Sequence, residues 1–151
     1  MPKPIRTVRV AAMDYLSRRE HATQELFQKL LAKGEYDADD ISEALSRLES
    51  QGLLSDERFA EAFINQRISK GHGPLKIRAE LRQKGVSDAM IESLMEQHND
   101  TWCGSALAVR INKYGSELPT DLKETARQTR FLQSRGFSGE QTRFALSHNE
   151  N

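Results

Sequence analysis

The chain has 151 residues, of which 37% are hydrophobic and 29% are charged, and its 22 lysines and arginines equal its 22 aspartates and glutamates. A chain of this length has no room for a second large domain, and a net charge of zero excludes attraction to nucleic acid by overall charge, so any such affinity must come from local patches. There is no apolar run of about 18 residues, as a membrane helix requires, and the start MPKPIRTVRV lacks the apolar core of a signal peptide. We therefore expect a cytoplasmic protein with no membrane partner.

The first third of the chain shows helical spacing of its apolar residues. Three apolar stripes, at 8–16, 26–31 and 41–48, predict three helices before Gly52. Only four prolines occur in the whole chain, and none of them interrupts such a stripe. No strand alternation or hairpin dipeptide competes with this pattern anywhere, so the expected fold class is all-α.

The middle third continues the pattern with marked helix starts and ends. A helix begins after Ser55, whose hydroxyl can accept from free backbone amides, and Asp56 lies near its positive end. The next helix starts at Pro74, because proline at the first helical position loses no needed hydrogen bond. It ends at Gly85, a residue suited to a left-handed C-terminal position. Ser87 starts the helix that follows.

The last third repeats this order of elements. Helices are expected at 106–114, 121–134 and 138–146, and Ser138 and Gln141 have the spacing of a capping box. The terminal residues SHNEN carry no packing pattern, so we expect them to be frayed.

Three glycines lie at one fixed interval along the chain. Gly34, Gly85 and Gly136 are separated by 51 residues, and each follows a lysine or arginine and lies four residues after a leucine. Three residue types at one spacing indicate three copies of one helical unit. The sequence therefore predicts an all-α fold of three tandem three-helix repeats that form an elongated, curved array. The predicted units are 1–54, 55–101 and 102–151.

Several side chains are candidates for the interior rather than for a binding site. Phe59 and Phe63 are one turn apart on an apolar stripe, which favours the core over base stacking. Trp102 lies near a unit boundary and suits the gap between two repeats. In the third copy, Gln128 and Thr142 stand at positions that are apolar elsewhere, so we expect this unit to contribute less to a rigid array.

Reactive chemistry has little support in the sequence. The four histidines, which have no metal-ligand spacing, are interpreted as surface or turn residues: His21, His72, His98 and His148. The single cysteine, Cys103, excludes an internal disulfide or a cysteine metal cluster, and we interpret it as a buried structural thiol. The carboxylates fall on polar helix faces and first turns. With no phosphate-binding loop or dinucleotide fingerprint either, the sequence predicts no enzyme and no catalytic, cofactor or metal site.

Charge is segregated although it sums to zero. The segment 67–84 contains six cations and one anion, Glu80, whereas 35–57 is strongly acidic. Arg78 and Arg82 are one turn apart and share a helix face. We predict that the six cations contact an anionic polymer or a charged protein assembly, while a solvated face without a partner remains the alternative. The six are Arg67, Lys70, Lys76, Arg78, Arg82 and Lys84.

Basic residues also recur in the outer thirds of the chain. If they lined one concave side of the array, they could follow a phosphate backbone or the groove of a filament. The recurring positions are Lys3, Arg6, Arg9, Arg18, Arg19, Arg127, Arg130, Arg135 and Arg143.

The run GLLSDERFAEAFINQRISKGHGPLKIRAELRQKGV, at 52–86, closely resembles the central signature of the RecX family, the regulatory proteins of the RecA recombinase. YLSRREHATQELFQKLLAKG, DTWCGSALAVRINKYG and RFLQSRGFS extend the similarity over nearly the whole chain. The resemblance implies three tandem three-helix repeats in a cytoplasmic bacterial protein without catalytic residues. It also implies binding to the RecA nucleoprotein filament and inhibition of recombinase, ATPase and coprotease activities, in homologous recombination, DNA repair and the SOS response.

The expected partner is thus the RecA filament, bound by a monomer, with phosphate contacts to single-stranded or duplex DNA as an addition. Two alternatives stay open. The pair of helices within 74–97 could act as a helix-turn-helix-like DNA-binding module, although its second helix holds Asp88, Glu92 and Glu96 and no cation. A helical scaffold could instead bind proteins alone, through apolar grooves between the units.

Overall fold

The computed structural model describes residues 6–149, which form helices and connecting segments with no β-strand in that range. The nine α-helices between residues 6 and 149 fall into three groups of three, which we call unit 1 (α1–α3), unit 2 (α4–α6) and unit 3 (α7–α9). The helices are α1 (Val8–Arg18), α2 (Thr23–Ala32), α3 (Ala38–Ser50), α4 (Asp56–Ser69), α5 (Pro74–Gln83), α6 (Asp88–Met95), α7 (Trp102–Tyr114), α8 (Leu122–Ser134) and α9 (Gly139–Ala145), with a short 3-10 turn η1 (Glu96–His98) after α6.

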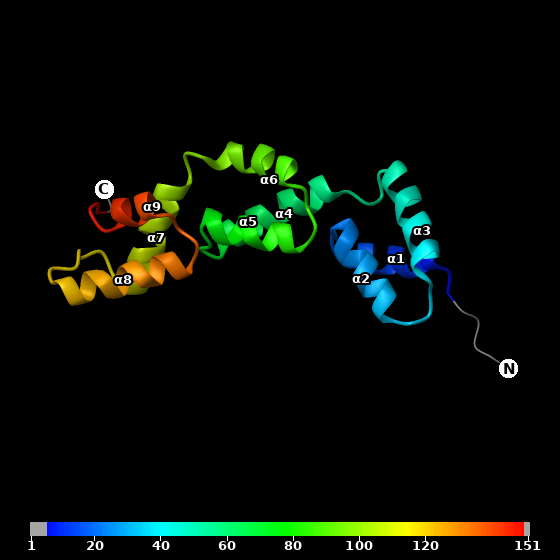
Figure 1. The fold of residues 1–151 in the computed structure, drawn as a ribbon. Coiled ribbons are helices and arrows are strands. Elements are labelled where there is room, and N and C mark those ends of the chain that lie inside the picture. Colours follow the sequence, from blue (N-terminus) through cyan, green and yellow to red (C-terminus); the bar gives the residue numbers. More distant parts are fainter. Residues whose placement is uncertain (1–5, 150–151) are drawn as a thin grey trace.

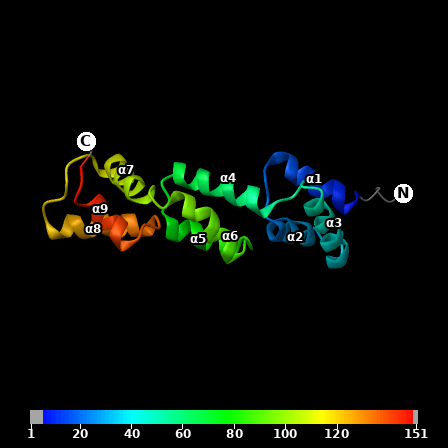
Figure 2. The ribbon, with the colours of Figure 1, turned by 90° about the horizontal axis from the view of Figure 1, so that it is seen from above.

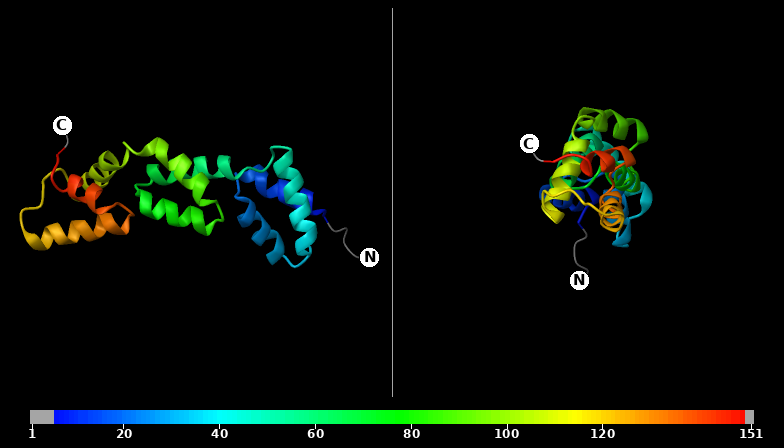
Figure 3. Two further views of the ribbon diagram at one scale, coloured as in Figure 1. Left: turned by 45° about the horizontal axis from the view of Figure 1, so that its top comes forward. Right: turned by 90° about the vertical axis from the view of Figure 1, so that its left-hand side faces the viewer.

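The units lie in an elongated, curved row, with units 1 and 3 at opposite ends (Figures 1 and 2). Viewed along the row they lie one behind another (Figure 3, right). The expected fold class is therefore confirmed, whereas the boundaries 54/55 and 101/102 stay a prediction. No helix within 6–149 combines the length and apolar character that crossing a bilayer requires.

Local sequence signals account for most helix starts. Ser55, Asp121 and Ser138 accept hydrogen bonds from backbone amides in the first turns of α4, α8 and α9, which satisfies donors that a helix leaves free. The side-chain oxygen of Gln141 in turn accepts a hydrogen bond from the backbone amide of Ser138, so the predicted capping box is present. Helices α2 and α5 differ, because Ala22 and Gly73 precede them and neither supplies a side-chain cap.

The three repeated glycines share one backbone conformation. Gly34, Gly85 and Gly136 have φ values of +73°, +88° and +99°, in the left-handed region that favours glycine. They follow the C-caps of α2, α5 and α8. The 51-residue spacing therefore arises because the second helix of each unit ends in the same left-handed glycine turn.

Each unit has its own apolar core, and the middle core extends across both boundaries. Phe59 and Phe63 of α4 lie in it, as predicted, with Ile77 and Leu81 among its other members. Trp102, the first residue of α7, is 4% exposed and packs into this unit 2 core. It confirms the expectation of a residue that fills the gap between repeats. From the other side, Ala22 before α2 contributes a buried methyl group.

Unit 3 has a small core built around buried polar side chains. Gln128 and Thr142 are both buried, and within the described part of the chain Oε1 of Gln128 and Oγ1 of Thr142 have no hydrogen-bond partner. Arg110 of α7 is fully buried and its guanidinium donates to backbone carbonyls, including Ala145 O at 2.7 Å. Because buried polar atoms normally require partners, these two oxygens are a cost to the stability of unit 3. The contribution of this unit to a rigid array stays a prediction.

Three sequence interpretations need correction. His21 is buried rather than on the surface: its Nδ1 lies 3.1 Å from Arg19 O and its Nε2 lies 3.0 Å from Lys29 Nζ. Burial lowers the pKa of His21 below its usual value and so favours the neutral imidazole. In that form Nε2 can accept a hydrogen bond from the Lys29 ammonium group. Cys103 is half-buried, not buried. Glu25 lies in the first turn of α2, where the sequence places acidic residues, but it is buried, so solvation does not account for this carboxylate.

Candidate functional site

The six cations predicted as contact residues lie at the end of α4 and along α5, but they do not form one open patch. Four of them are engaged in ion pairs among residues 6–149. These four are Arg67, Arg78, Arg82 and Lys84.

The two arginines that share a face of α5 point at the carboxylates of α6. Arg78 Nε lies 2.8 Å from Glu92 Oε1, and Arg82 Nε lies 2.8 Å from Asp88 Oδ1. These pairs neutralise much of the positive charge of α5 on this side. The α5–α6 pair therefore presents mixed charge, which is a poor surface for a phosphate-lined DNA groove.

Arg67 is held within unit 2. Its Nη2 lies 3.2 Å from Glu80 Oε2, and its guanidinium stacks over the ring of Phe63 at 4.6 Å from the centroid. His72 Nδ1 lies 3.6 Å from the other oxygen of Glu80. Burial and then the charge of Lys76 lower the pKa of His72, so His72 adds little positive charge here at neutral pH.

Lys70 and Lys76 are the two predicted cations without an ion pair among the described residues. Lys70 is exposed at the end of α4, and Lys76 is half-buried beside the turn between α8 and α9. Both ammonium groups are thus the freest of the six to meet an external anion.

A groove of about 550 Å³ lies between units 1 and 2, and we call it the first groove. Phe59, Ala62 and Phe63 of α4 supply its apolar lining. Charged residues of both units complete it: Arg19, Glu20, Glu25, Arg67, Lys70 and Lys84.

A second groove, of about 310 Å³, lies between units 2 and 3. Lys70 lines both grooves, so the two adjoin. In the second groove Lys113 and Arg135 lie over the Phe131 ring, 5.4 and 5.2 Å from its centroid. We call the cations of both grooves the groove face: Arg19, Arg67, Lys70, Lys84, Lys113 and Arg135.

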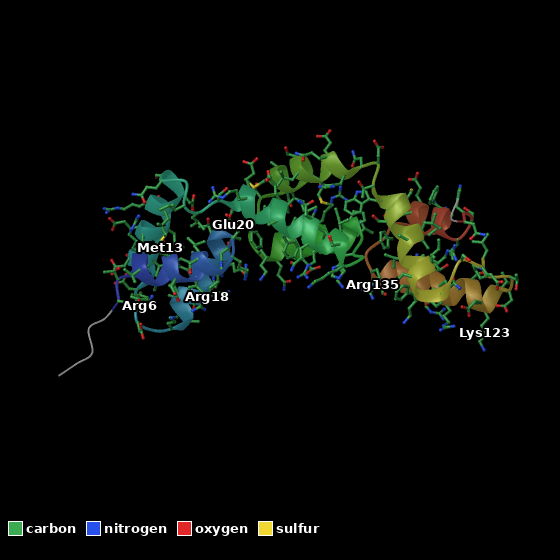
Figure 4. All side chains as sticks on the ribbon, turned by 180° about the vertical axis from the view of Figure 1, so that it is seen from behind. Arg6, Met13, Arg18, Glu20, Lys123 and Arg135 are labelled. Carbon is green, nitrogen blue, oxygen red and sulfur yellow. The ribbon has the colours of Figure 1, made fainter. Side chains whose placement is uncertain are left out.

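The groove face extends along the row rather than within one unit. Figure 4 shows Arg135 of this face on the lower side of the molecule, where unit 3 meets unit 2. Of the outer basic positions, Arg19 and Arg135 line the grooves, whereas Lys3 lies outside the described residues. The sequence pattern missed Lys113, which carries no signal beyond its charge.

Glu25 joins units 1 and 2 at the bottom of the first groove. Its Oε2 lies 2.7 Å from Arg19 Nη2 and 2.9 Å from Lys84 Nζ, although Lys84 is 59 residues away in sequence. Burial alone would raise the pKa of this carboxyl, but the bonds from Arg19 and Lys84 outweigh it and lower the pKa to about 2. Glu25 is therefore ionised throughout the physiological range.

The comparison with protein families agrees with this architecture. Models of the first, second and third three-helix domains of RecX match residues 9–48, 55–95 and 105–146. The chain belongs to the RecX family.

Curated relatives cover nearly the whole of this RecX-family chain. The regulatory protein RecX of Halorhodospira halophila is 44% identical over 140 residues, 93% of this chain and 86% of the relative. That of Vibrio vulnificus is 42% identical over 144 residues, 95% and 94% of the two chains. The relatives are named as regulatory proteins rather than as enzymes.

Two crystal structures share the fold. RecX from Lactobacillus salivarius has a TM-score of 0.77 at 22% identity and covers 91% of both chains. A second structure, titled regulatory protein RecX, has a TM-score of 0.79 at 20% identity and covers 93% of this chain and 70% of its own. The tandem three-helix architecture therefore persists in RecX proteins of low sequence identity.

Substituting Glu25→Gln in this RecX-family chain is expected to lower the free energy of unfolding at pH 7 by about 2 kcal/mol. One unit of pKa shift corresponds to about 1.4 kcal/mol, and the partial exposure of Arg19 and Lys84 reduces the full value. Because the folded pKa lies below the ordinary 4.5, this stability is present above pH 4.5 and lost as the pH falls toward 2. Urea unfolding at pH 7 and at low pH measures it.

The matched control is Glu43→Gln, since Glu43 pairs with Arg47 on the surface of α3, where both side chains are more than half exposed. Glu43→Gln is expected to lower the free energy of unfolding by less than about 0.5 kcal/mol at either pH. Equal losses for the two variants at pH 7 would contradict the role assigned to Glu25.

Proposed function

We propose that this chain binds the filament of the RecA recombinase and inhibits its recombinase, ATPase and coprotease activities. Membership of the RecX family is the observation that carries the proposal. The protein acts as a monomer in the cytoplasm, in homologous recombination, DNA repair and the SOS response, and contributes no catalytic residue.

The mechanism is occupancy of the filament surface. An elongated row of three units reaches several repeating protomers at once (Figure 1), so weak contacts combine into useful avidity. The groove face supplies cations at both unit junctions, and these meet acidic side chains of the recombinase or phosphates of the DNA that it coats. Contacts of this kind weaken as salt rises.

An ATPase titration tests the proposal most directly. The recombinase is assembled on single-stranded DNA and its ATP hydrolysis is followed while this protein is added. We expect hydrolysis to fall as the protein approaches saturation. Unchanged hydrolysis at saturating protein would count against inhibition, and a sedimentation assay with the coated DNA would then show whether binding itself fails.

Removing Lys70 and Lys76, the two of the six predicted cations that form no ion pair within residues 6–149, is expected to weaken filament binding. The double variant Lys70→Gln and Lys76→Gln keeps much of each side-chain stem and breaks no ion pair among the described residues. Loss of two phosphate or carboxylate contacts predicts a fall in affinity of about fivefold to tenfold at low salt, with a shallower dependence on salt concentration. Fluorescence anisotropy with labelled DNA coated by recombinase measures both quantities.

Arg47→Gln serves as the control, because Arg47 is an exposed cation of α3 outside both grooves whose pair with Glu43 is fully at the surface. Its affinity is expected to stay within about twofold of the parent protein. If the control weakens binding as much as the double variant, Lys70 and Lys76 are not specific contacts of the filament.

The same assay separates the alternatives. A helix-turn-helix-like module would prefer one duplex sequence over coated DNA, but the engagement of Glu92 and Asp88 by the α5 arginines gives that reading little physical support. A scaffold that binds proteins alone would bind the recombinase with little dependence on salt.

A further inference from the structure

The two junctions in the row of units are built from different interactions. Units 2 and 3 meet backbone to backbone at two buried glycines, Gly73 and Gly136. Gly73 N donates to Arg135 O at 2.7 Å, and Leu75 N donates to Gly136 O at 2.9 Å. The turn between α8 and α9 therefore satisfies the free amides at the start of α5, which has no side-chain cap of its own.

These contacts leave no space for relative movement. A Cβ atom on Gly73 would lie 2.4 Å from the carbonyl carbon of Gly136, and one on Gly136 would lie 2.4 Å from Lys76 Cβ. Trp102 adds its indole from α7 to the core of unit 2. Buried backbone hydrogen bonds and close packing are not screened by salt, so the contacts of this junction are independent of ionic strength.

Units 1 and 2 meet through charged and polar groups instead. Glu25 binds Lys84 at 2.9 Å, and Glu20 Oε1 binds Arg58 Nε at 2.9 Å. The amide of Thr23, at the start of α2, donates to Asp56 Oδ1 at 2.7 Å. Among residues 6–149, no backbone-to-backbone hydrogen bond crosses this junction.

Apolar and close contacts across the first junction are slight. Ala22 gives one methyl group to the core of unit 2. Gly85 approaches α2 closely, since a Cβ there would lie 2.6 Å from Gln24 Cβ, but Gln24 is an exposed side chain at the surface of its helix. Two ion pairs cross this junction, and their cations Arg58 and Lys84 are 45% and 39% exposed. Salt can therefore screen both pairs, the one to the buried Glu25 less than the one to Glu20.

We propose that the row bends at the junction of units 1 and 2, where Glu25 is the positioning residue that holds unit 1 against unit 2, while units 2 and 3 move as one body. Ionic strength sets the stiffness of the first junction and not that of the second. The proposal concerns the free protein and does not rest on binding to the recombinase.

Pairs of spin labels on the full chain measure each junction separately. Cys103, the single cysteine, is replaced by alanine, and cysteines are introduced at exposed sites of each unit: Ser46, Ser93 and Lys123. The pair Ser46→Cys with Ser93→Cys spans the first junction, and Ser93→Cys with Lys123→Cys spans the second. Double electron–electron resonance gives the distance distribution of each pair.

From about 0.05 M to about 1 M NaCl, over which the Debye length falls from about 14 Å to about 3 Å, the first distribution is expected to broaden about twofold. The second is expected to keep its width. Glu25→Gln should broaden the first distribution already at low salt, with Glu43→Gln as the control that leaves it unchanged. Circular dichroism confirms that each variant keeps its helices.

Two results would overturn the proposal. If both distributions broaden alike with salt, the junctions do not differ in stiffness. If neither broadens with salt or with Glu25→Gln, the ion pairs do not hold the first junction. The salt series uses the unsubstituted Glu25, so it gives an answer even where the variant is unstable.

Discussion

Gly136→Ala is expected to lower the free energy of unfolding by about 3 kcal/mol or more, because two penalties coincide at this residue. Its φ of +99° is a conformation that side chains rarely adopt. An added Cβ would also lie 2.4 Å from Lys76 Cβ and 2.7 Å from Lys76 N. Alanine can be accepted only if units 2 and 3 separate. Urea unfolding followed by circular dichroism measures the loss.

Gly34→Ala is the matched control, since Gly34 holds the equivalent position in unit 1. Its φ of +73° is also left-handed, but nothing lies within 4 Å of an added Cβ. Only the backbone penalty of about 1 kcal/mol remains. Similar losses for the two variants would show that the contact between Gly136 and Lys76 carries no energy.

Arg110→Met is expected to destabilise unit 3 by about 3–5 kcal/mol. The fully buried guanidinium donates to Ala145 O at 2.7 Å, Gly115 O at 3.1 Å and Glu117 O at 3.2 Å. One side chain therefore forms hydrogen bonds with both the end of α9 and the segment after α7. Methionine fills a similar volume but leaves these carbonyls without a donor. Burial lowers the pKa of Arg110, yet an arginine stays charged in a protein.

Arg130→Met provides the comparison, because Arg130 is exposed on α8. We expect a change within about 0.5 kcal/mol for it. Hydrogen exchange of the α9 amides shows whether Arg110→Met destabilises unit 3 alone or the whole chain. If the effect is local, these amides should exchange faster than those of unit 1. If Arg110→Met is as stable as Arg130→Met, the bonds to the carbonyls are not what holds α9.

Helix ends were predictable because their determinants are local. Ser55 and Ser138 cap helices whose first amides lie within three residues of their hydroxyls. Proline begins α5, and a left-handed glycine follows α2, α5 and α8. The apolar stripe predicts a start of α7 at 106, but the helix begins at Trp102, which lies one turn before Ala106 on the buried face and packs into the core of unit 2.

The candidate site was predictable only as a list of charges. Arg78 and Arg82 share a face of α5, as the sequence indicated, but Glu92 and Asp88 of α6 form ion pairs with them. The carboxylate that joins two units, Glu25, had no distinguishing pattern. Its partner Lys84 is brought to it by the packing of α2 against the end of α5.

By itself, the sequence determined the all-α class, the three repeated units and the left-handed glycines, because capping bonds and apolar stripes are satisfied within one helix or one turn. Only the tertiary structure decided which cations stay free and which glycines are irreplaceable. Ion pairs and close backbone contacts depend on the helix that faces a residue, and residues in equivalent repeat positions face different neighbours. An added Cβ on Gly34 would have no atom within 4 Å, whereas one on Gly136 would collide with Lys76 in the first turn of α5.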